Sequence, residues 1–319
     1  MTALLEVTGL RVSFPGANGP VFPVDGVSFT LARGETLALV GESGSGKTLS
    51  GLALLRLLPP PGRIDPASSI LLEGRDLLSL APEPLRQVRG RKIAMVFQDP
   101  MSSLNPVLTV GEQITEAIQA HLPVPGREAR SRAETLLGEV GIADPGRRLR
   151  SYPHQLSGGM RQRVMIAIAL SAEPELLIAD EPTSALDVTV QAQILEVLDR
   201  LRAARGMAVL LITHDLGIVA GRADRVAVMY AGRIVEQAET GQLFDAPTHP
   251  YTRGLFASMP RLTGPRQRPQ PIPGTVPSPT AWPTGCRFRP RCPQAMERCS
   301  EEPPERTVEP GHVSRCWLE

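Results

Sequence analysis

The sequence predicts an α/β fold in which a mostly parallel sheet is covered on both faces. Continuously apolar runs at residues 36–40, 176–180 and 209–213 have the length of buried strands. Helical patterns at 159–171 and 188–205 alternate with the last two runs. Strands that alternate with helices form parallel sheets, and ligands bind such sheets at the carboxyl ends of the strands.

The remaining elements follow from local patterns. Residues 4–8 and 27–31 alternate apolar and polar side chains and predict strands, which a Pro/Gly-rich connection at Pro15–Pro23 joins. A helix is expected from residue 47 to residue 58, where three consecutive prolines follow. Further strands are expected at residues 70–72 and 93–97, and helices without strands across 110–149.

The chain has 319 residues, more than one typical core needs, so we expect a main domain with an appendage. We place the main domain at residues 1–246, with a helical subdomain at about 100–158, and a C-terminal extension rich in Pro and Arg at 247–319. There is no leading cationic and apolar stretch, and no apolar run near the roughly 20 residues that a bilayer requires. A cytosolic protein is therefore expected, unless it docks on a membrane-bound partner.

A glycine-rich phosphate loop is predicted between strand 36–40 and the following helix. Residues 41–48 fit the pattern G-x-x-x-x-G-K-[ST] in the strand–loop–helix context that this motif requires. The backbone N–H groups of such a loop point inward at an anion, and the helix N-terminus adds partial positive charge. Lys47 would reach the β- and γ-phosphates of a nucleotide, and Thr48 would ligate Mg²⁺. The predicted contacts are Gly41, Ser43, Gly44, Ser45, Gly46, Lys47 and Thr48.

The strand at 176–180 delivers two acidic residues, Asp180 and Glu181, to the same sheet edge as the phosphate loop. Asp180 would hold Mg²⁺, and Glu181 would orient the attacking water or accept its proton. Without the phosphate loop, the same pattern would more often be a strand followed by a solvated turn. With the loop present, the catalytic interpretation is favoured.

A second anion site is predicted at Ser157, Gly158 and Gly159, which lead into a helical pattern. The hydroxyl of Ser157 can cap this helix, and the two glycines leave backbone N–H groups open. The alternative is simply a well-capped helix.

With these motifs in the order observed, the chain resembles the nucleotide-binding subunits of ABC transporters, which have the P-loop NTPase fold. Ser157–Gly159 matches their signature, with Met160 where many members have Gln. Gln98 matches the Q-loop, residues 184–187 match the D-loop and His214 matches the switch histidine. Each of these single residues has a structural alternative: a turn residue for Gln98, a helix cap for Asp187 and a satisfied strand-end histidine for His214.

The resemblance implies two ATP molecules between head-to-tail subunits, the phosphate loop of one facing the signature of the other. It implies an aromatic residue on adenine, for which Phe14 is favoured and Phe22 is the rival, because the Pro15–Pro23 connection makes the register ambiguous. The implied catalytic residues are Lys47, Gln98, Glu181 and His214. The implied nucleotide contacts outside the phosphate loop are Phe14, Gln98, Ser157, Gly158, Gly159 and Asp187, and the implied Mg²⁺ ligands are Thr48, Gln98 and Asp180.

Two further segments, residues 99–106 and 247–253, resemble the dipeptide/oligopeptide (and nickel) importer subgroup. This implies ATP-driven import of di- or oligopeptides at the cytoplasmic face of the bacterial cytoplasmic membrane. The implied partners are two integral-membrane permease subunits, a second ATPase subunit that is a paralogue or an identical copy, and indirectly an external peptide-binding protein. The helical subdomain would receive a coupling helix of the permease.

Three alternatives stay open at this stage. The chain could serve an importer of nickel or another small solute, it could be a soluble ABC ATPase acting on nucleic acid or ribosomes, or it could sense nucleotide without turnover. A net charge of +1, one cassette, no long heptad run and no basic stripe argue against a nucleic-acid partner. The intact set of catalytic residues argues against a sensor.

The C-terminal extension holds all four cysteines, Cys286, Cys292, Cys299 and Cys316. Their spacing, C-x5-C-x6-C-x16-C, lacks the close pairs of structural zinc sites, whereas iron–sulfur clusters tolerate varied spacings. Residues 286–293 resemble the extension of peptide-importer ATPases, in some of which a [4Fe–4S] cluster is bound. We favour that cluster over zinc or no metal, and a structured appendage over a disordered linker. Arg287, Arg289 and Arg291 would offset thiolate charge.

Overall fold

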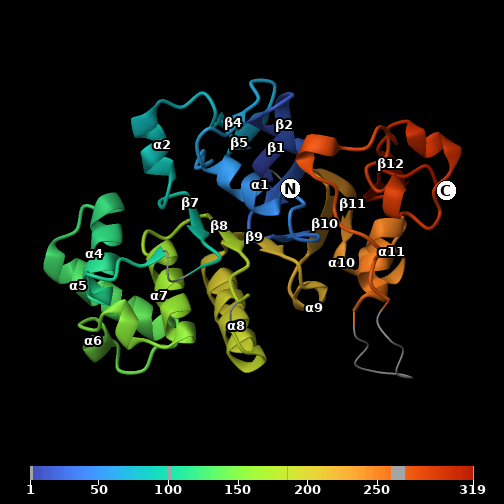
Figure 1. Cartoon of the computed structure of the whole chain (residues 1–319). Coiled ribbons are helices and arrows are strands. Elements are labelled where there is room, and N and C mark those ends of the chain that lie inside the picture. Colours follow the sequence, from blue (N-terminus) through green and yellow to red (C-terminus); the bar gives the residue numbers. More distant parts are fainter. Residues whose placement is uncertain (1–2, 100–102, 185, 260–269, 319) are drawn as a thin grey trace.

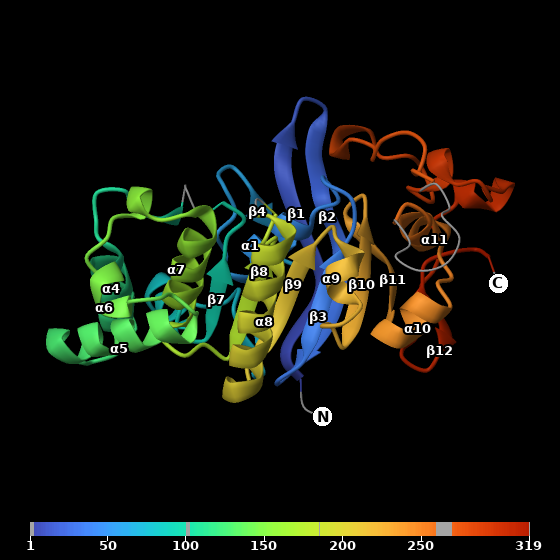
Figure 2. The same cartoon turned by 90° about the horizontal axis from the view of Figure 1, so that it is seen from below.

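The computed structural model describes residues 3–99, 103–184, 186–259 and 270–318, which fold around two β-sheets (Figure 1). The helical segment α4–α6 lies at one end of the molecule and the C-terminal extension at the opposite end, in both views (Figure 2). The strands are β1 (Ala3–Gly16), β2 (Gly19–Ala32), β3 (Thr36–Val40), β4 (Arg63–Ile64), β5 (Ser69–Leu72), β6 (Arg75–Asp76), β7 (Ile93–Val96), β8 (Leu176–Asp180), β9 (Ala208–Thr213), β10 (Arg225–Tyr230), β11 (Arg233–Glu239), β12 (Arg306–Glu309) and β13 (His312–Ser314). The α-helices are α1 (Lys47–Leu54), α2 (Pro82–Val88), α4 (Val110–His121), α5 (Gly126–Glu139), α6 (Pro145–Arg148), α7 (Gly158–Leu170), α8 (Val188–Arg205), α9 (Leu216–Val219), α10 (Thr240–Asp245) and α11 (Pro250–Ala257).

The larger sheet has the strand order β12-β13-β11-β10-β3-β9-β8-β7. The run from β10 to β7 is parallel throughout, whereas β11, β13 and β12 add antiparallel strands at the other side. The prediction of a mostly parallel sheet is therefore confirmed for the part that carries the predicted phosphate loop and acidic strand.

Strands β8 and β9 are apolar up to their last residues, Asp180 and Thr213, because each of their faces enters a different core. Leu176 and Ile178 of β8 pack in a cluster with the N-terminal strands, whereas Leu177 and Ala179 pack in a second cluster with helices α4, α5, α7 and α8. All five residues of β8 are buried. A strand covered on both faces loses the alternation of a surface strand and reads as a continuous apolar run.

The Pro15–Pro23 connection was predicted wrongly, because most of it is strand. β1 and β2 form one long antiparallel hairpin in which Pro15 is opposite Pro20, and only residues 17 and 18 lie outside the strands. The smaller sheet has the order β2-β1-β5-β6, with β4 also paired to β1, so β2 is an edge strand. An edge strand tolerates proline because its outer N–H groups have no ladder partner to lose.

The end of the first helix was also predicted too late. Helix α1 ends at Leu54, and Arg56 takes a left-handed conformation with a φ of 52°. The chain therefore leaves the helix before it reaches the prolines at 59–61. The other predicted helices and strands are confirmed, and most of their ends lie within one or two residues of the predicted positions.

The predicted helical insert is confirmed by α4, α5 and α6, which pack in one core with α7 and α8. Helix α4 begins at a capping box, in which the Thr109 hydroxyl accepts from the Glu112 N–H and the Glu112 carboxylate accepts from the Thr109 N–H. The proposed limits of this subdomain stay predictions, and its first residues, 100–102, lie outside the described residues.

The described part of the C-terminal extension is folded against the rest of the molecule, which contradicts the alternative of a disordered linker. Strand β13 pairs with β11 and so belongs to the larger sheet. Tyr251 and Phe288 share a third core with Val228 and Tyr230 of β10. The division at 246/247 stays a prediction of sequence, because these side chains form one core across it. Among the helices described, none is long and apolar enough to span a bilayer.

Candidate functional site

The phosphate loop joins β3 to α1, as predicted. At two of its glycines, any other residue would introduce a steric clash and a strained backbone. Gly41 and Gly46 have φ angles of 153° and 104°. A Cβ at position 41 would collide with the carbonyl oxygen of Met229, and a Cβ at position 46 would lie 2.5 Å from the carbonyl oxygen of Pro23. The loop thus packs directly on β10 and on β2.

The ammonium group of Lys47 holds this loop from within. Its Nζ donates to the carbonyl oxygens of Gly41 at 2.7 Å and of Glu42 at 3.0 Å. The side chain is buried, and this burial lowers the pKa of Lys47, against the opposing effect of the carboxylates of Glu181 and Asp180. A nearby polyphosphate would therefore favour the charged form of this lysine.

Thr48, in the first turn of α1, meets Asp180 at the carboxyl end of β8. The Thr48 hydroxyl donates to Oδ1 of Asp180 at 3.2 Å. Asp180 is only 2% exposed, and burial raises the pKa of this carboxyl to about 6. A divalent cation beside Asp180 and Thr48 would offset the desolvation of the carboxylate, so the pair fits a magnesium site.

Two predicted catalytic residues converge on a third, Glu181. Its Oε2 accepts from Nε2 of Gln98 at 3.0 Å, and its Oε1 lies 2.9 Å from Nδ1 of His214. The N–H of Glu181 donates to the carbonyl oxygen of Ile212, and its φ is 44°. These contacts exist because β7, β8 and β9 are adjacent and parallel, so the residues that follow them emerge at one sheet edge.

A cavity of about 240 Å³ lies over the phosphate loop. Its lining consists of Pro23, Ser43, Gly44, Gly46, Lys47, Thr48, Leu49, Gln98 and Glu181. The sequence analysis missed Pro23 and Leu49. Pro23 falls in the connection that was not recognised as a strand, and no local pattern marks it as facing the loop.

The two candidate aromatic residues lie in different surroundings. Phe14 packs against the N-terminal core, and its ring is beside Gly62. Phe22 lies 5.1 Å below the guanidinium of Arg11, and its carbonyl oxygen accepts from Nε1 of Trp282. The ring of Phe22 therefore packs on Arg11, and its backbone contacts the C-terminal extension. The adenine contact of Phe14 stays a prediction.

The signature segment forms a capped helix start away from this cavity. Oγ of Ser157 accepts from the N–H of Met160 at 3.3 Å, and Gly158 and Gly159 begin α7. A Cβ at position 159 would lie 2.6 Å from Cγ1 of Val190 in α8. The residues found to line the cavity include none of these three, so the two predicted anion sites of one chain do not share a pocket.

Asp187 caps helix α8, because its Oδ1 accepts from the N–H of Val190 at 2.9 Å. This is the structural role that was considered as the alternative to nucleotide binding. The neighbour of Asp187 in the D-loop, Ala185, lies outside the described residues, as do Pro100, Met101 and Ser102 of the importer-like segment. The nucleotide contact of Asp187 stays a prediction.

None of the four cysteines forms a disulfide. Burial raises the pKa of Cys286 to about 11 and also raises the pKa of Cys292 and Cys316, and a charge on Cys299 raises each of these three pKa values further. No group of three or more His, Cys, Asp or Glu side chains within the described ranges is arranged to hold a metal ion.

Backbone N–H groups nevertheless point at three of the four sulfur atoms. Such hydrogen bonds stabilise a thiolate and are a common surrounding of cysteines that bind iron or zinc. The donors are the N–H groups of Phe288 to Cys286, of Gln294 to Cys292 and of Leu318 to Cys316, each two residues after its cysteine. The donor set therefore fits a thiolate-bound group in its chemistry.

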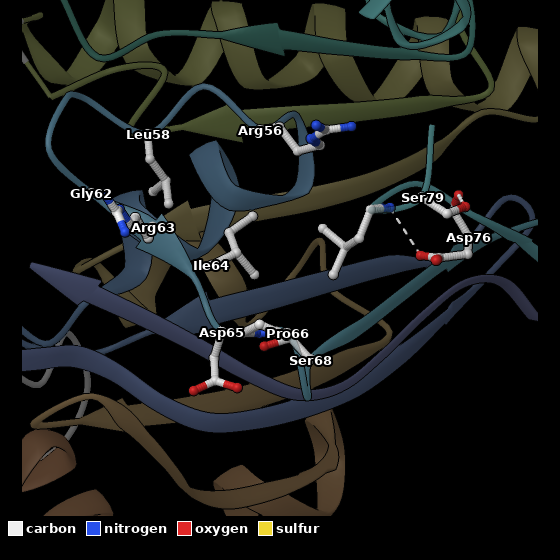
Figure 3. A pocket seen from close by; sticks show the side chains of 11 residues that line it. Arg56, Leu58, Gly62, Arg63, Ile64, Asp65, Pro66, Ser68, Asp76 and Ser79 are labelled. Atoms are coloured by element: carbon white, nitrogen blue, oxygen red, sulfur yellow. Dashed lines mark hydrogen bonds between the residues drawn. The ribbon is translucent and has the colours of Figure 1, made fainter. Parts of the chain in front are cut away.

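A second, larger cavity of about 590 Å³ lies between the end of α1 and the smaller sheet (Figure 3). Leu58, Ile64 and Ser68 are among its lining, and the carboxylate of Asp76 accepts from the N–H of Leu78 at 2.9 Å. Figure 3 shows the carboxylate of Asp65 pointing away from Ile64. This cavity contains none of the predicted catalytic residues.

Comparison with known proteins gives two family matches. The profile of the ABC transporter family matches residues 24–184, and that of the oligopeptide/dipeptide transporter C-terminal region matches residues 235–299. The chain is 50% identical to the oligopeptide transport ATP-binding protein AppD of Bacillus subtilis, over all of this chain and 97% of that protein. It is 48% identical to the dipeptide transport ATP-binding protein DppD of the same organism, over all of this chain and 96% of that one.

Solved structures give the same fold. The dimeric ATP-binding cassette MJ0796 bound to ADP and Pi has a TM-score of 0.66 and 26% identity, covering 74% of this chain and 98% of that one. CbiO1 from Clostridium perfringens, part of an ABC transporter complex, has a TM-score of 0.65 and 27% identity, covering 77% and 92%. The predicted P-loop NTPase fold is thus confirmed.

Proposed function

We propose, from the premise that this chain belongs to the ABC transporter family and to its oligopeptide/dipeptide branch, that it hydrolyses ATP to power the import of dipeptides or oligopeptides across a membrane. The convergence of Gln98 and His214 on Glu181, beside the phosphate loop, carries the proposal. The full-length similarity to peptide-transport ATP-binding proteins supports the choice of cargo.

ATP binds with its phosphates in the glycine-rich loop. Backbone N–H groups of the loop, other than those of Glu42 and Ser45, and the ammonium of Lys47 neutralise the phosphate oxygens. Thr48 and Asp180, with Gln98, would hold Mg²⁺, which would offset the negative charge of the phosphates. Phe14 stacks on the adenine ring. The shared hydrogen bond of Thr48 and Asp180 supports this assignment.

Hydrolysis takes place at Glu181. A carboxylate in hydrogen-bond reach of the attacking water orients it and accepts its proton. Gln98 holds one oxygen of that carboxylate, and His214 lies beside the other and stabilises the γ-phosphate as it departs.

Ser157, Gly158 and Gly159 bind the γ-phosphate of ATP held by a second ATPase subunit, and Asp187 lies at the same interface. Their position away from the cavity of their own chain supports this arrangement. So does the dimeric form of the similar cassette MJ0796. Enclosure from both sides excludes water from the triphosphate and strengthens its electrostatic contacts.

The partners are two integral-membrane permease subunits, a second ATPase subunit that is a paralogue or an identical copy, and indirectly an external peptide-binding protein. The protein is then peripheral to the cytoplasmic face of the membrane. The similarity to subunits of transport systems supports this location.

Cys286, Cys292, Cys299 and Cys316 hold a [4Fe–4S] cluster. The backbone N–H groups that face three of the four sulfur atoms support this assignment, as does the effect of a charge on Cys299, which raises the pKa of the other three thiols. When bound, the cluster supplies a covalent crosslink between segments of the C-terminal extension, which has few regular elements of its own.

Reconstitution in liposomes tests the proposed function. Co-purified with its permeases, the chain should drive ATP-dependent uptake of a labelled dipeptide or oligopeptide, and Lys47→Ala should abolish it. ATP-dependent uptake of Ni²⁺ with no uptake of either peptide would instead assign the chain to the nickel importers.

A further inference from the structure

The C-terminal extension contacts the phosphate loop from outside at Glu42. Nη1 and Nη2 of Arg291 donate to the two carboxylate oxygens of Glu42 at 2.7 Å and 2.9 Å. The backbone N–H of Glu42 donates to the hydroxyl of Tyr251 at 2.8 Å. Arg291 and Tyr251 lie 249 and 209 positions from Glu42 in the sequence, so both contacts are purely tertiary.

Arg291 is itself fixed in place. Its side chain is only 4% exposed, and Nε donates to the carbonyl oxygen of Pro273 at 2.8 Å. Nη2 also donates to the carbonyl oxygen of Gly274, and the guanidinium lies 5.7 Å from the ring centroid of Tyr230. A planar guanidinium that pairs with a carboxylate through two parallel hydrogen bonds fixes the direction as well as the distance of its partner.

Tyr251 packs in an aromatic cluster with Tyr230 and Phe288. The ring centroids lie 4.5 Å apart for Tyr230 and Tyr251, 5.2 Å for Tyr230 and Phe288, and 5.4 Å for Tyr251 and Phe288. All three rings are at most 2% exposed. Phe288 and Arg291 belong to the segment between Cys286 and Cys292, so one short stretch of the extension supports both contacts to Glu42.

Glu42 in turn contacts Lys47, the lysine of the phosphate loop. The carbonyl oxygen of Glu42 accepts from Nζ of Lys47 at 3.0 Å, so Glu42 is bound through its side chain, its N–H and its carbonyl group at once. A shift of the Glu42 backbone would therefore move an acceptor of Lys47 and the neighbouring N–H groups of the loop. Binding of an anion by backbone N–H groups depends on this geometry.

We propose that Arg291 is a positioning residue for the phosphate loop, and that the C-terminal extension sets the affinity for ATP through Arg291, Tyr251 and Glu42. This inference rests on the proposed function only in that the loop binds ATP. Arg291 is not among the residues found to line the cavity over the phosphate loop, so it acts through the backbone of Glu42.

The test is equilibrium binding of a fluorescent ATP analogue with Mg²⁺, together with the steady-state KM and kcat of hydrolysis, on the full chain. Arg291→Ala should raise the Kd and KM about tenfold, with kcat changed less than about twofold. Arg291→Lys keeps the charge but not the paired hydrogen bonds, so its Kd should also rise. Arg289→Ala is the matched control, because Arg289 is an exposed residue of the same turn, and its Kd should equal that of the wild type.

Glu42→Gln weakens the same Arg291–Glu42 ion pair by a change in the loop. It keeps the proposal testable if Arg291→Ala fails to fold. Its Kd should rise similarly, and in the double variant with Arg291→Lys the effects should not add. Folded Arg291 and Glu42 variants with a Kd within twofold of the wild type would overturn the proposal, as would a loss of kcat at constant KM. A wild-type protein that binds no nucleotide would instead refute the proposed function.

Discussion

Nδ1 of His214 lies 2.9 Å from Oε1 of Glu181, although 33 positions separate the two residues. The contact places a group that can donate a hydrogen bond beside the carboxylate that follows β8. With Gln98 on the other carboxylate oxygen, Glu181 is held in one orientation over the phosphate loop. This arrangement makes the role of each residue accessible to mutation.

Glu181→Gln should retain ATP binding and lose hydrolysis by about a hundredfold or more, because an amide cannot accept the proton of water. The variant should accumulate as an ATP-bound dimer, which size-exclusion chromatography with and without ATP would detect. Lys47→Ala is the control and should form no such dimer. Hydrolysis at the wild-type rate would remove Glu181 from its proposed role.

Phe14→Ala should raise the Kd for ATP about tenfold, because stacking on a base contributes roughly 1–3 kcal/mol. The Kd for inorganic tripolyphosphate should not change, since that ligand has no adenine. Phe22→Ala serves as the matched variant from the same hairpin and should leave both affinities unchanged. Equal effects on ATP and tripolyphosphate would show that Phe14 acts on the fold and not on adenine.

Gly159→Ala should lower the free energy of unfolding by about 1–3 kcal/mol, because the added methyl group would overlap Val190 and force α7 and α8 apart. Gly158→Ala places its methyl at an ordinary contact distance of 3.5 Å from Leu186 and is the control. Denaturant unfolding without nucleotide separates this packing effect from any loss of phosphate binding. Equal stability of the two variants would contradict the close contact of position 159.

His249 predicts a loss of stability in mild acid. Burial lowers the pKa of this imidazole to about 4, from about 6.5 in an unfolded chain, and its Nδ1 accepts from the N–H of Tyr251 at 3.0 Å. Between pH 6.5 and 4 the unfolded chain binds the extra proton, so stability should fall as pH falls through this window, by on the order of 2–3 kcal/mol.

His249→Asn should reduce that dependence on pH, measured as the free energy of unfolding at several pH values. His154→Asn, at an exposed position, should leave it unchanged. Glu236, whose carboxylate accepts from the His249 N–H, has a lowered pKa and adds its own loss of stability at lower pH. A His249→Asn protein with the wild-type dependence between pH 6.5 and 4 would contradict the assignment.

Protein purified without oxygen should carry about four iron and four sulfide ions per chain and show a broad visible absorption. Replacement of any one of the four cysteines by serine should reduce the iron content and bleach this absorption. Iron and sulfide assays with metal analysis check the prediction. Zinc in place of iron and sulfide would overturn the proposed cluster.

The elements that carry the site follow from local sequence patterns. Continuous apolar runs gave β3, β8 and β9, and the glycine pattern gave the loop that follows β3. Because parallel strands end at one sheet edge, the positions of Lys47, Asp180 and Glu181 relative to one another could be predicted from their places after strands. Local periodicity reports the backbone and its buried face, which is sufficient for such residues.

Tertiary structure alone decided what surrounds that loop. The β1–β2 hairpin brings Pro23 to the cavity despite a proline-rich sequence, and the fold brings Arg291 to Glu42 across 249 positions. Within the sequence, Arg291 is one of several arginines near cysteines, and nothing local distinguishes it from the exposed Arg289. Burial and pairing of a charge depend on which distant segments pack together, and no local pattern encodes that packing.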